Sequence, residues 1–493
     1  MEQIMYKSTR GSEKLLTSAE AIKKGIAEDG GLYMPTSIPK VTLDFISSMV
    51  DDEYCERAYK ILSLYLTDYN KDTLHEICRK AYSDCRFKGG AAPVVKLDEK
   101  ISVLELWHGP TCAFKDMALQ IMPMLLSEAL KMTGEDKTAF ILVATSGDTG
   151  KAALEGYRDV DGVKIMVFYP ENGVSAMQKL QMASQEGENV SVVAIKGNFD
   201  DAQTGVKEIF ASKEIAEKLL EKNTFLSSAN SINWGRLVPQ VAYYFSAYCD
   251  MVKSGEIKLG DKINVVVPTG NFGNIFAGHL ARVMGLPVNK FICASNKNSV
   301  LTDFIEKGVY DKNRDFYLTM SPSMDILVSS NVERMLSLIA DTDTVKSYMS
   351  ALKTEGIYTL SDSEKDALKS GFSAGFTTEE ETADTINRVY HNKGYLLDTH
   401  TAVAMKCAED FNEKTGAAEK MLVVSTASPY KFATSVLEAI GGEKGVLGIE
   451  APEKLEAFSK KEIPLPLVKL HEKRIRFTKS IEKTEMAKEV LEF

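Results

Sequence analysis

Four short, mainly apolar runs constrain the fold of this chain most strongly, because each leads through a turn of small and polar residues into a helical pattern. They are Ser102–Leu106, Ala139–Ala144, Ile263–Val267 and Met421–Val424. Such runs are typical of strands buried on both faces, and the helical patterns between them predict βαβ units and parallel sheets. Because parallel sheets bind ligands at the carboxyl ends of their strands, we expect the four turns to lie at a functional site.

The first ninety residues differ from the rest of the chain. They are mostly helical in pattern, as in Ala19–Glu28 and Tyr54–Leu66, and they contain no comparable strand. We therefore expect an N-terminal, mostly helical domain over residues 1–95. A charged stretch over Ser361–His391 and a lysine-rich tail after Gly442 predict solvent-exposed helices.

The composition narrows the class of protein. Of 493 residues, 44% are hydrophobic and 26% are charged, which fits a globular chain with a large core and excludes a disordered chain or a coiled coil. With 59 Lys and Arg against 69 Asp and Glu, the net charge of −10 offers no basic surface for nucleic acid or anionic lipid. Any anionic small molecule must therefore be held by a local site.

The cysteines and histidines exclude further classes. Seven scattered cysteines without a Cys-x-x-Cys pair indicate a reducing compartment. No apolar stretch resembles a signal peptide, and no run approaches the roughly 20 apolar residues of a membrane helix. We therefore expect a cytoplasmic protein that does not contact a membrane. The six histidines lack the spacing of zinc ligands, so no metal site is predicted.

The turn after the third run, Pro268–Asn274, is a candidate phosphate site. Gly270 and Gly273 let main-chain N–H groups approach an anion, and the following helix adds unpaired N–H groups and a positive dipole end. The alternative from spacing alone is a tight turn without a ligand. The glycines do not form Gly-x-Gly-x-x-Gly, which disfavours a nicotinamide-dependent dehydrogenase.

The turn after the second run, Thr145–Lys151, ends in Gly-Lys but is not a Walker A loop. Thr145 stands where the first glycine would be, and Ala152 follows the lysine. Hydroxyl groups at a helix start suit a carboxylate or a phosphate, or they simply cap the helix.

A lysine follows the first run in an unusually apolar setting. Lys115 has Phe114 before it and Met117 shortly after it. Burial at a helix start would lower its pKa, and a neutral amine can form a Schiff base, whereas most lysines are solvated surface groups. The fourth turn, Ser425–Lys431, presents hydroxyl groups just after a strand and says little alone.

Taken together and in this order, the turns resemble those of threonine synthase, a pyridoxal-phosphate enzyme of the tryptophan-synthase-β fold type. The segments that carry the resemblance are Tyr6–Gly11, Glu28–Tyr33, His108–Leu119, Thr145–Gly150, Ser228–Trp234, Ser321–Asp325, Ser330–Asn331, Asp398–His400 and Ser425–Thr426. The resemblance spans residues 6 to about 442 and is specific because several segments match at once.

The resemblance implies an α/β protein of PLP-dependent fold type II. Two open parallel-sheet α/β lobes would hold the cofactor in the cleft between them, after the N-terminal helical domain. We expect this catalytic region over residues 96–493, with the smaller lobe at roughly 130–250 and the larger lobe formed by the remainder.

The resemblance also implies roles for particular residues. The cofactor is expected to be pyridoxal 5′-phosphate, with Lys115 as its Schiff-base lysine and the catalytic residue. The residues implied to hold the cofactor phosphate are Gly270, Asn271, Phe272, Gly273 and Asn274, and Thr426 is implied at the pyridine nitrogen. The candidates for binding the substrate are Ser146, Gly147, Asp148, Thr149, Lys151, Arg236, Ser323 and Asn331.

The implied reaction converts O-phospho-L-homoserine and water to L-threonine and phosphate. Lys115 is expected to carry protons, because it would sit at the reacting face. One alternative is a phospho-lyase on the same scaffold, which would release 2-oxobutyrate and ammonia. Another is a non-catalytic metabolite-binding protein. We expect a monomer or a homodimer that acts on a small molecule alone.

Overall fold

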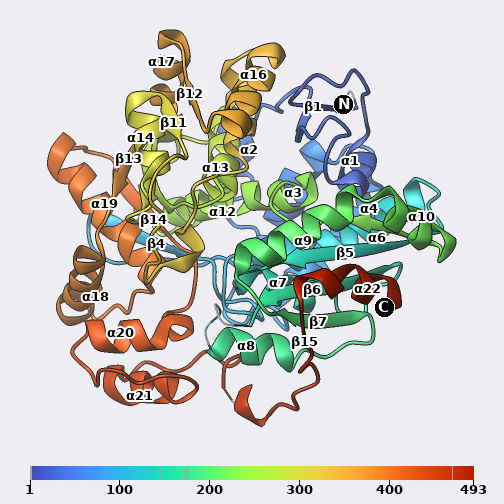
Figure 1. Ribbon diagram of the computed structural model, residues 1–493. Coiled ribbons are helices and arrows are strands. Elements are labelled where there is room, and N and C mark those ends of the chain that lie inside the picture. The colour runs from blue at the N-terminus through green and yellow to red at the C-terminus, as the bar shows by residue number, and fades with distance from the viewer. Residues whose placement is uncertain (1–2, 146, 172–173, 175, 469) are drawn as a thin grey trace.

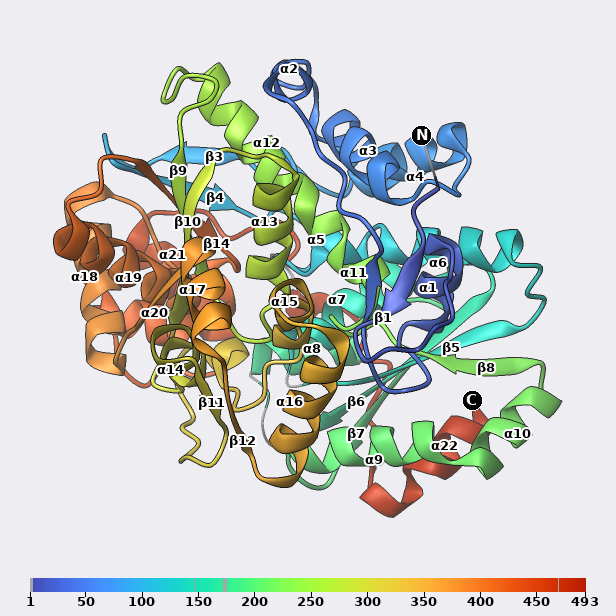
Figure 2. The same ribbon diagram turned by 90° about the horizontal axis from the view of Figure 1, so that it is seen from above.

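Two sheets lie side by side and form the frame of the molecule (Figure 1, Figure 2). The computed structural model describes residues 3–145, 147–171, 174, 176–468 and 470–493. The larger sheet has the strand order β13-β10-β9-β14-β4-β3, and only β3 runs antiparallel to its neighbour. Its strands are β3 (Val94–Lys96), β4 (Ile101–Glu105), β9 (Ile263–Pro268), β10 (Val288–Ser295), β13 (Phe372–Phe376) and β14 (Lys420–Ser425). Three of the four predicted strands are its β4, β9 and β14, so the prediction of a parallel α/β sheet is confirmed.

The smaller sheet is parallel throughout and has the order β15-β7-β6-β5-β8. Its strands are β5 (Thr138–Ala144), β6 (Val163–Pro170), β7 (Val190–Ile195), β8 (Thr224–Ser227) and β15 (Ser480–Ile481). The position of β15 corrects one expectation, because the tail was predicted as solvent-exposed helix and was counted with the larger lobe. Ile481 and Met486 are instead buried against this smaller sheet, so the tail is held there by its apolar residues.

The N-terminal segment contains four helices and also strands, and its helices cover less than half of it. Its helices are α1 (Ser18–Lys24), α2 (Leu43–Ser47), α3 (Tyr54–Tyr65) and α4 (Lys71–Ala81), and its antiparallel strands are β1 (Tyr6–Ser8) and β2 (Tyr33–Pro35). Strands of three residues are too short to give a visible alternation in sequence. Helix α3 packs on α12 (Pro239–Lys253), and α1 packs on α6 (Met122–Met132). Because α6 follows β4 of the larger sheet and α12 follows β8 of the smaller sheet, the N-terminal segment covers helices connected to both sheets.

Helices connect the strands and cover the sheets. In Figure 2, α9, α10 and α22 lie together along the outer side of the smaller sheet, and α18 to α21 gather at the far side of the larger one. The remaining helices are α5 (Asp116–Leu119), α7 (Asp148–Tyr157), α8 (Ala176–Ala183), α9 (Phe199–Ala211), α10 (Lys213–Glu221), α11 (Trp234–Leu237), α13 (Gly273–Met284), α14 (Val300–Lys307), α15 (Val332–Ile339), α16 (Thr342–Thr354), α17 (Asp362–Gly371), α18 (Glu379–Lys393), α19 (Thr399–Thr415), α20 (Ala433–Ala439), α21 (Glu450–Ser459) and α22 (Met486–Glu492). Within the described ranges, no helix is long and apolar enough to cross a membrane.

The charged stretch over Ser361–His391 is not wholly helical, which corrects a second expectation. Strand β13 interrupts it between α17 and α18 and forms the edge of the larger sheet. Its sequence, Phe-Ser-Ala-Gly-Phe, has no β-branched residue and is only partly buried, so it gives a weak strand signal. A separate antiparallel pair, β11 (Val309–Asp311) and β12 (Ile357–Thr359), lies beyond this edge.

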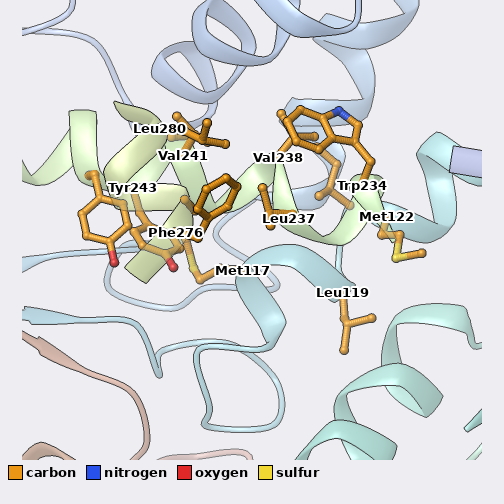
Figure 3. Packing of buried hydrophobic residues seen from close by; sticks show 14 of the residues in the cluster. Met117, Leu119, Met122, Trp234, Leu237, Val238, Val241, Tyr243, Phe276 and Leu280 are labelled. Atoms are coloured by element: carbon orange, nitrogen blue, oxygen red, sulfur yellow. The ribbon is translucent and has the colours of Figure 1, made fainter. Parts of the chain in front are cut away.

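A buried apolar cluster fixes the short helix α5 that follows Lys115. Met117 and Leu119 of α5 are fully buried in the same cluster as Trp234 of α11, Val241 of α12 and Phe276 of α13 (Figure 3). Full burial of a methionine or leucine side chain stabilises the fold by about 2 kcal/mol. The main chain that carries Lys115 is therefore anchored directly in the core.

Candidate active site

Loops from both sheets converge at the carboxyl ends of their strands. The loop after β4 is bonded to the loop after β14, because Phe114 N–H donates to Thr426 O at 2.8 Å and Ser428 N–H donates to Cys112 O at 3.0 Å. Strand β9 lies next to β14 in the same sheet, so the loop after β9 opens at the same edge. The structure thus brings the predicted lysine loop, phosphate loop and Thr426 loop together.

The Lys115 side chain lies among charged groups in a partly buried position. Burial lowers the pKa of Lys115 to about 8, the nearby carboxylate of Asp148 opposes this change, and the cations of Arg236 and Lys431 add to it. The uncharged form of the amine is therefore much more populated near neutral pH than in a solvent-exposed lysine. An uncharged amine can attack a carbonyl group or accept a proton.

The loop after β9 has the geometry of an anion cradle. Phe272 has the left-handed φ of 60° and precedes the first residue of α13, and no side chain caps this helix. A Cβ on Gly270 would lie 2.6 Å from the main-chain oxygen of Ser323, so only glycine fits there. In the described part of the chain, no acceptor receives the main-chain N–H groups of Asn271, Phe272 or Gly273.

Asn274 adds a side-chain donor to this cradle. Its Oδ1 accepts hydrogen bonds from the hydroxyl groups of Tyr243 and Tyr244, at 2.5 and 2.6 Å. Its Nδ2 is buried and has no partner among the residues that the structure describes. Buried donors are normally bonded, so the free Nδ2 and the free N–H groups fit a bound phosphate.

The loop after β5 places a buried carboxylate beside Lys115. Asp148 is the first residue of α7 and lies 2.7 Å from the Nζ of Lys431. Burial alone would raise the pKa of Asp148, but the ammonium groups of Lys431 and Lys115 hold it well below its usual range. Gly147 precedes it with a φ of 144°, and Thr149 follows it in the first turn of α7. Ser146, also predicted here, lies outside the described residues.

Arg236 is a buried cation without a buried anion beside it. One guanidinium nitrogen donates to Ala229 O at 2.8 Å, and none of the described carboxylates lies within ion-pair distance of it. Burial lowers the pKa of Arg236 to about 10. A buried charge is normally paired, so this guanidinium is suited to an anion from outside the chain.

The other residues predicted to bind the substrate phosphate, Ser323, Asn331 and Lys151, lie in two different places. Ser323 and Asn331 lie against the loop after β9, since Ser323 O contacts Gly270 and Asn331 Nδ2 donates to Asn271 O at 2.9 Å. Lys151 does not join them.

Lys151 forms an ion pair with Glu155 one turn along α7 at 3.2 Å and donates to Gln185. It lines a cavity of about 980 Å³ whose lining residues do not include Lys115. The helical spacing between Lys151 and Glu155 explains why this lysine turns away from the group around Lys115.

Two features of the site were missed from sequence. Lys431 stands in the predicted fourth turn, but nothing local indicates its contact with Asp148. The other feature is the contact between two buried groups, Asp398 and His400, whose segment the resemblance includes without a role; Nδ1 of the histidine lies 3.1 Å from the carboxylate. Nε2 of the same ring accepts from Ser323 N–H at 3.1 Å, so the pair supports the segment that packs on Gly270.

Comparison with known proteins gives matches along nearly the whole chain. Family models described as "Threonine synthase N terminus", "Pyridoxal-phosphate dependent enzyme" and "Threonine synthase, C-terminal" match residues 5–82, 88–428 and 401–491. The chain is 41% identical to human threonine synthase-like 1 over 86% of its own length, but it spans only 58% of that relative. It is 39% identical to threonine synthase of Pseudomonas aeruginosa, over 90% of this chain and 92% of the relative.

Solved structures agree with these matches. A pyridoxal-phosphate-bound threonine synthase from Brucella melitensis superimposes with a TM-score of 0.88 at 37% identity, over 99% of each chain. The yeast threonine synthase structure gives a TM-score of 0.88 at 34% identity, over 99% of this chain and 98% of that one.

Proposed function

Because the chain belongs to the threonine synthase family of pyridoxal-phosphate-dependent enzymes, we propose that it converts O-phospho-L-homoserine and water to L-threonine and phosphate. One observation carries the proposal for this chain: Lys115, an amine with a lowered pKa, lies near the unpaired buried cation Arg236, and its loop opens at the same edge of the larger sheet as the anion cradle at Gly270–Asn274. A reactive amine together with two groups suited to bind anions fits a phosphorylated cofactor and a phosphorylated substrate.

Pyridoxal phosphate would be held by groups from three loops. Lys115 Nζ would attach it covalently, the main chain of Gly270–Asn274 would bind its phosphate, and Thr426 would meet its ring nitrogen. When bound, the cofactor supplies an electron sink for negative charge that develops on the substrate carbon skeleton. A hydroxyl group at Thr426 binds the ring nitrogen without forcing it to stay protonated, unlike a carboxylate.

The substrate would be oriented by its two anionic groups. The main-chain N–H groups at Asp148 and Thr149, in the first turn of α7, would receive its carboxylate. The Arg236 guanidinium, with Ser323 and Asn331 nearby, would bind its phosphate and stabilise charge on that group as it leaves. Ser146 and Gly147 would complete the carboxylate site.

Lys115 would then move protons between substrate carbons. In its uncharged form, Nζ would accept the Cα proton; the γ-phosphate would leave once a Cβ proton is also lost, Cγ would then be protonated, and Cα would regain a proton when water has added. The buried helix α5 keeps this amine in place throughout. Water would add at Cβ on the same face.

The proposal extends to the setting of the enzyme. All seven cysteines are free, which supports a reducing compartment, and we propose the cytoplasm. We propose that the enzyme acts on its small-molecule substrate as a monomer or a homodimer.

The test is product analysis with purified protein, pyridoxal phosphate and O-phospho-L-homoserine. Threonine with one equivalent of phosphate supports the proposal, and Lys115→Ala should abolish both products. Phosphate with 2-oxobutyrate would replace synthase by phospho-lyase. Turnover at the wild-type rate in Lys115→Ala would refute the role of the lysine.

A further inference from the structure

A fully buried ion pair joins the strand-end loops of the two sheets. The Nζ of Lys431 lies 2.7 Å from the carboxylate of Asp148, and the two side chains are 0% and 3% exposed. Lys431 follows β14 of the larger sheet, whereas Asp148 follows β5 of the smaller sheet and begins α7. The pair is therefore a direct electrostatic contact between the two halves of the site.

Each partner makes a second contact. Lys431 Nζ donates to Thr111 O at 2.9 Å, in the same loop as Lys115, and Asp148 accepts from Gln178 Nε2 of α8 at 3.0 Å. Lys431 thus fixes the lysine loop and the start of α7 at once. Burial of two charges gains little net stability, whereas loss of one partner leaves an uncompensated buried charge. The arrangement therefore favours a role in the site.

We infer that Lys431 is a positioning residue that holds Asp148 at the start of α7 and cancels its negative charge, so that this end of the helix can receive the carboxylate of an anionic substrate. The inference rests on the proposed function, in which the first N–H groups of α7 bind that carboxylate. Without the ammonium group, the Asp148 carboxylate would repel the substrate at the point where the helix dipole attracts it.

The same pair also acts on Lys115. Four charged side chains influence this amine: Asp148 and Asp116, which favour its charged form, and Arg236 and Lys431, which disfavour it. Removal of Lys431 should therefore raise the pKa of Lys115, and removal of the Asp148 charge should lower it. When both charges are removed, the two opposite shifts of the Lys115 pKa should largely cancel. A change that only loosened the structure would not produce opposite shifts.

The experiment is a double-mutant cycle with Lys431→Met, Asp148→Asn and the variant carrying both, because Met and Asn keep the approximate shape of Lys and Asp. Each enzyme is loaded with pyridoxal phosphate. Without substrate, the pH midpoint of the cofactor absorbance band reports protonation of the Schiff-base nitrogen that Lys115 contributes, and the same four charges should shift it in the same directions as the free amine. The values of kcat and KM are measured with O-phospho-L-homoserine. We expect Lys431→Met to raise KM about 100-fold, more than it lowers kcat, and to move the midpoint upward. Asp148→Asn should move the midpoint downward, and the double variant should return KM to within about tenfold of the wild type.

The inference is overturned if Lys431→Met keeps the wild-type KM, if the double variant is no better than Lys431→Met, or if both single variants move the midpoint the same way. If Lys431→Met does not fold, the inference is overturned when the double variant keeps a KM more than about tenfold above that of the wild type, or when Asp148→Asn does not move the midpoint downward. If no enzyme, including the wild type, consumes O-phospho-L-homoserine, the proposed function fails. The absorbance midpoints alone then decide the role of Lys431.

Discussion

Replacing Arg236 with methionine should stabilise the substrate-free protein while it removes most of the catalysis. The guanidinium is buried with one hydrogen bond, to Ala229 O, and with no carboxylate among the described residues. Burial lowers its pKa to about 10, between two and three units below its ordinary value. Each pKa unit corresponds to 1.36 kcal/mol, so the folded state carries this charge at a cost of about 3 kcal/mol.

The sign and the pH window follow from the direction of the pKa change. Since the pKa of Arg236 is lower in the folded state, the cost is fully present below about pH 10 and disappears only above pH 12.5. Methionine removes the cost, keeps the apolar stem and loses the hydrogen bond, which is worth about 1.5 kcal/mol. The free energy of unfolding should rise by about 1–2 kcal/mol, equally at pH 6 and pH 9.

Loss of substrate binding should accompany this gain. Charge-assisted hydrogen bonds to a phosphate are worth about 1.5–3 kcal/mol each, so loss of two lowers kcat/KM by about 10²–10⁴-fold. The assays are urea denaturation of the cofactor-free protein and steady-state kinetics of the loaded enzyme. Inorganic phosphate should stabilise the wild type against urea and have little effect on Arg236→Met.

Arg334 provides the matched control. It is also buried, and burial lowers its pKa to about 9, but it donates to Tyr33 O, Ser231 O, Ile232 O and Asn331 Oδ1. Arg334→Met should therefore destabilise the protein, by about 3 kcal/mol or more. If Arg236→Met is destabilised to the same extent, or keeps kcat/KM within threefold of the wild type, the argument from an unpaired buried cation is wrong.

Three further predictions address the lysine, the phosphate cradle and the helix that carries Asp148. Covalent attachment of pyridoxal phosphate to the cofactor-free protein should speed up with pH, reach half its maximal rate near pH 8 and level off about one pH unit higher, because burial lowers the pKa of Lys115 to about 8; a half-maximal rate only above pH 10, seen by stopped-flow absorbance, would contradict this burial. Gly270→Ala should weaken cofactor binding at least about tenfold in a fluorescence titration, because its Cβ would lie 2.6 Å from Ser323 O, and unchanged affinity would mean that the loop is not the cradle. Gly156→Ala should lower the free energy of unfolding by about 3 kcal/mol, since its Cβ would lie 1.9 Å from Leu119 O; a urea midpoint equal to that of the wild type would show that α7 does not pack tightly on this carbonyl.

Part of the fold was predictable because its signals are local. The runs at β4, β5, β9 and β14 are mainly apolar, and each ends in a turn, so strands and parallel sheets follow from the pattern alone. Strand β13 gave no such signal because it is short, lies at an edge and contains no β-branched residue. Strand β15 has two residues and is defined only by its partner β7.

Some features of the candidate site are likewise predictable from local sequence, and others are not. The glycine loop at Gly270–Asn274 is predicted as an anion site from its own sequence, and Lys115 is predicted as the Schiff-base lysine from the resemblance. The contact of Lys431 with Asp148 joins segments on different sheets, so no spacing indicates it. Lys151 was predicted to bind the substrate because its neighbours in sequence suggest a phosphate loop. Its ion-pair partner is instead Glu155, which lies one helical turn further on.

The most direct test of the whole account is the identity of the product formed from O-phospho-L-homoserine by the loaded enzyme. The account predicts L-threonine and phosphate in equal amounts, with an oxygen from solvent water on Cβ when the reaction runs in labelled water. Release of 2-oxobutyrate and ammonia with phosphate, or recovery of unchanged substrate from enzyme that has bound its cofactor, would contradict it.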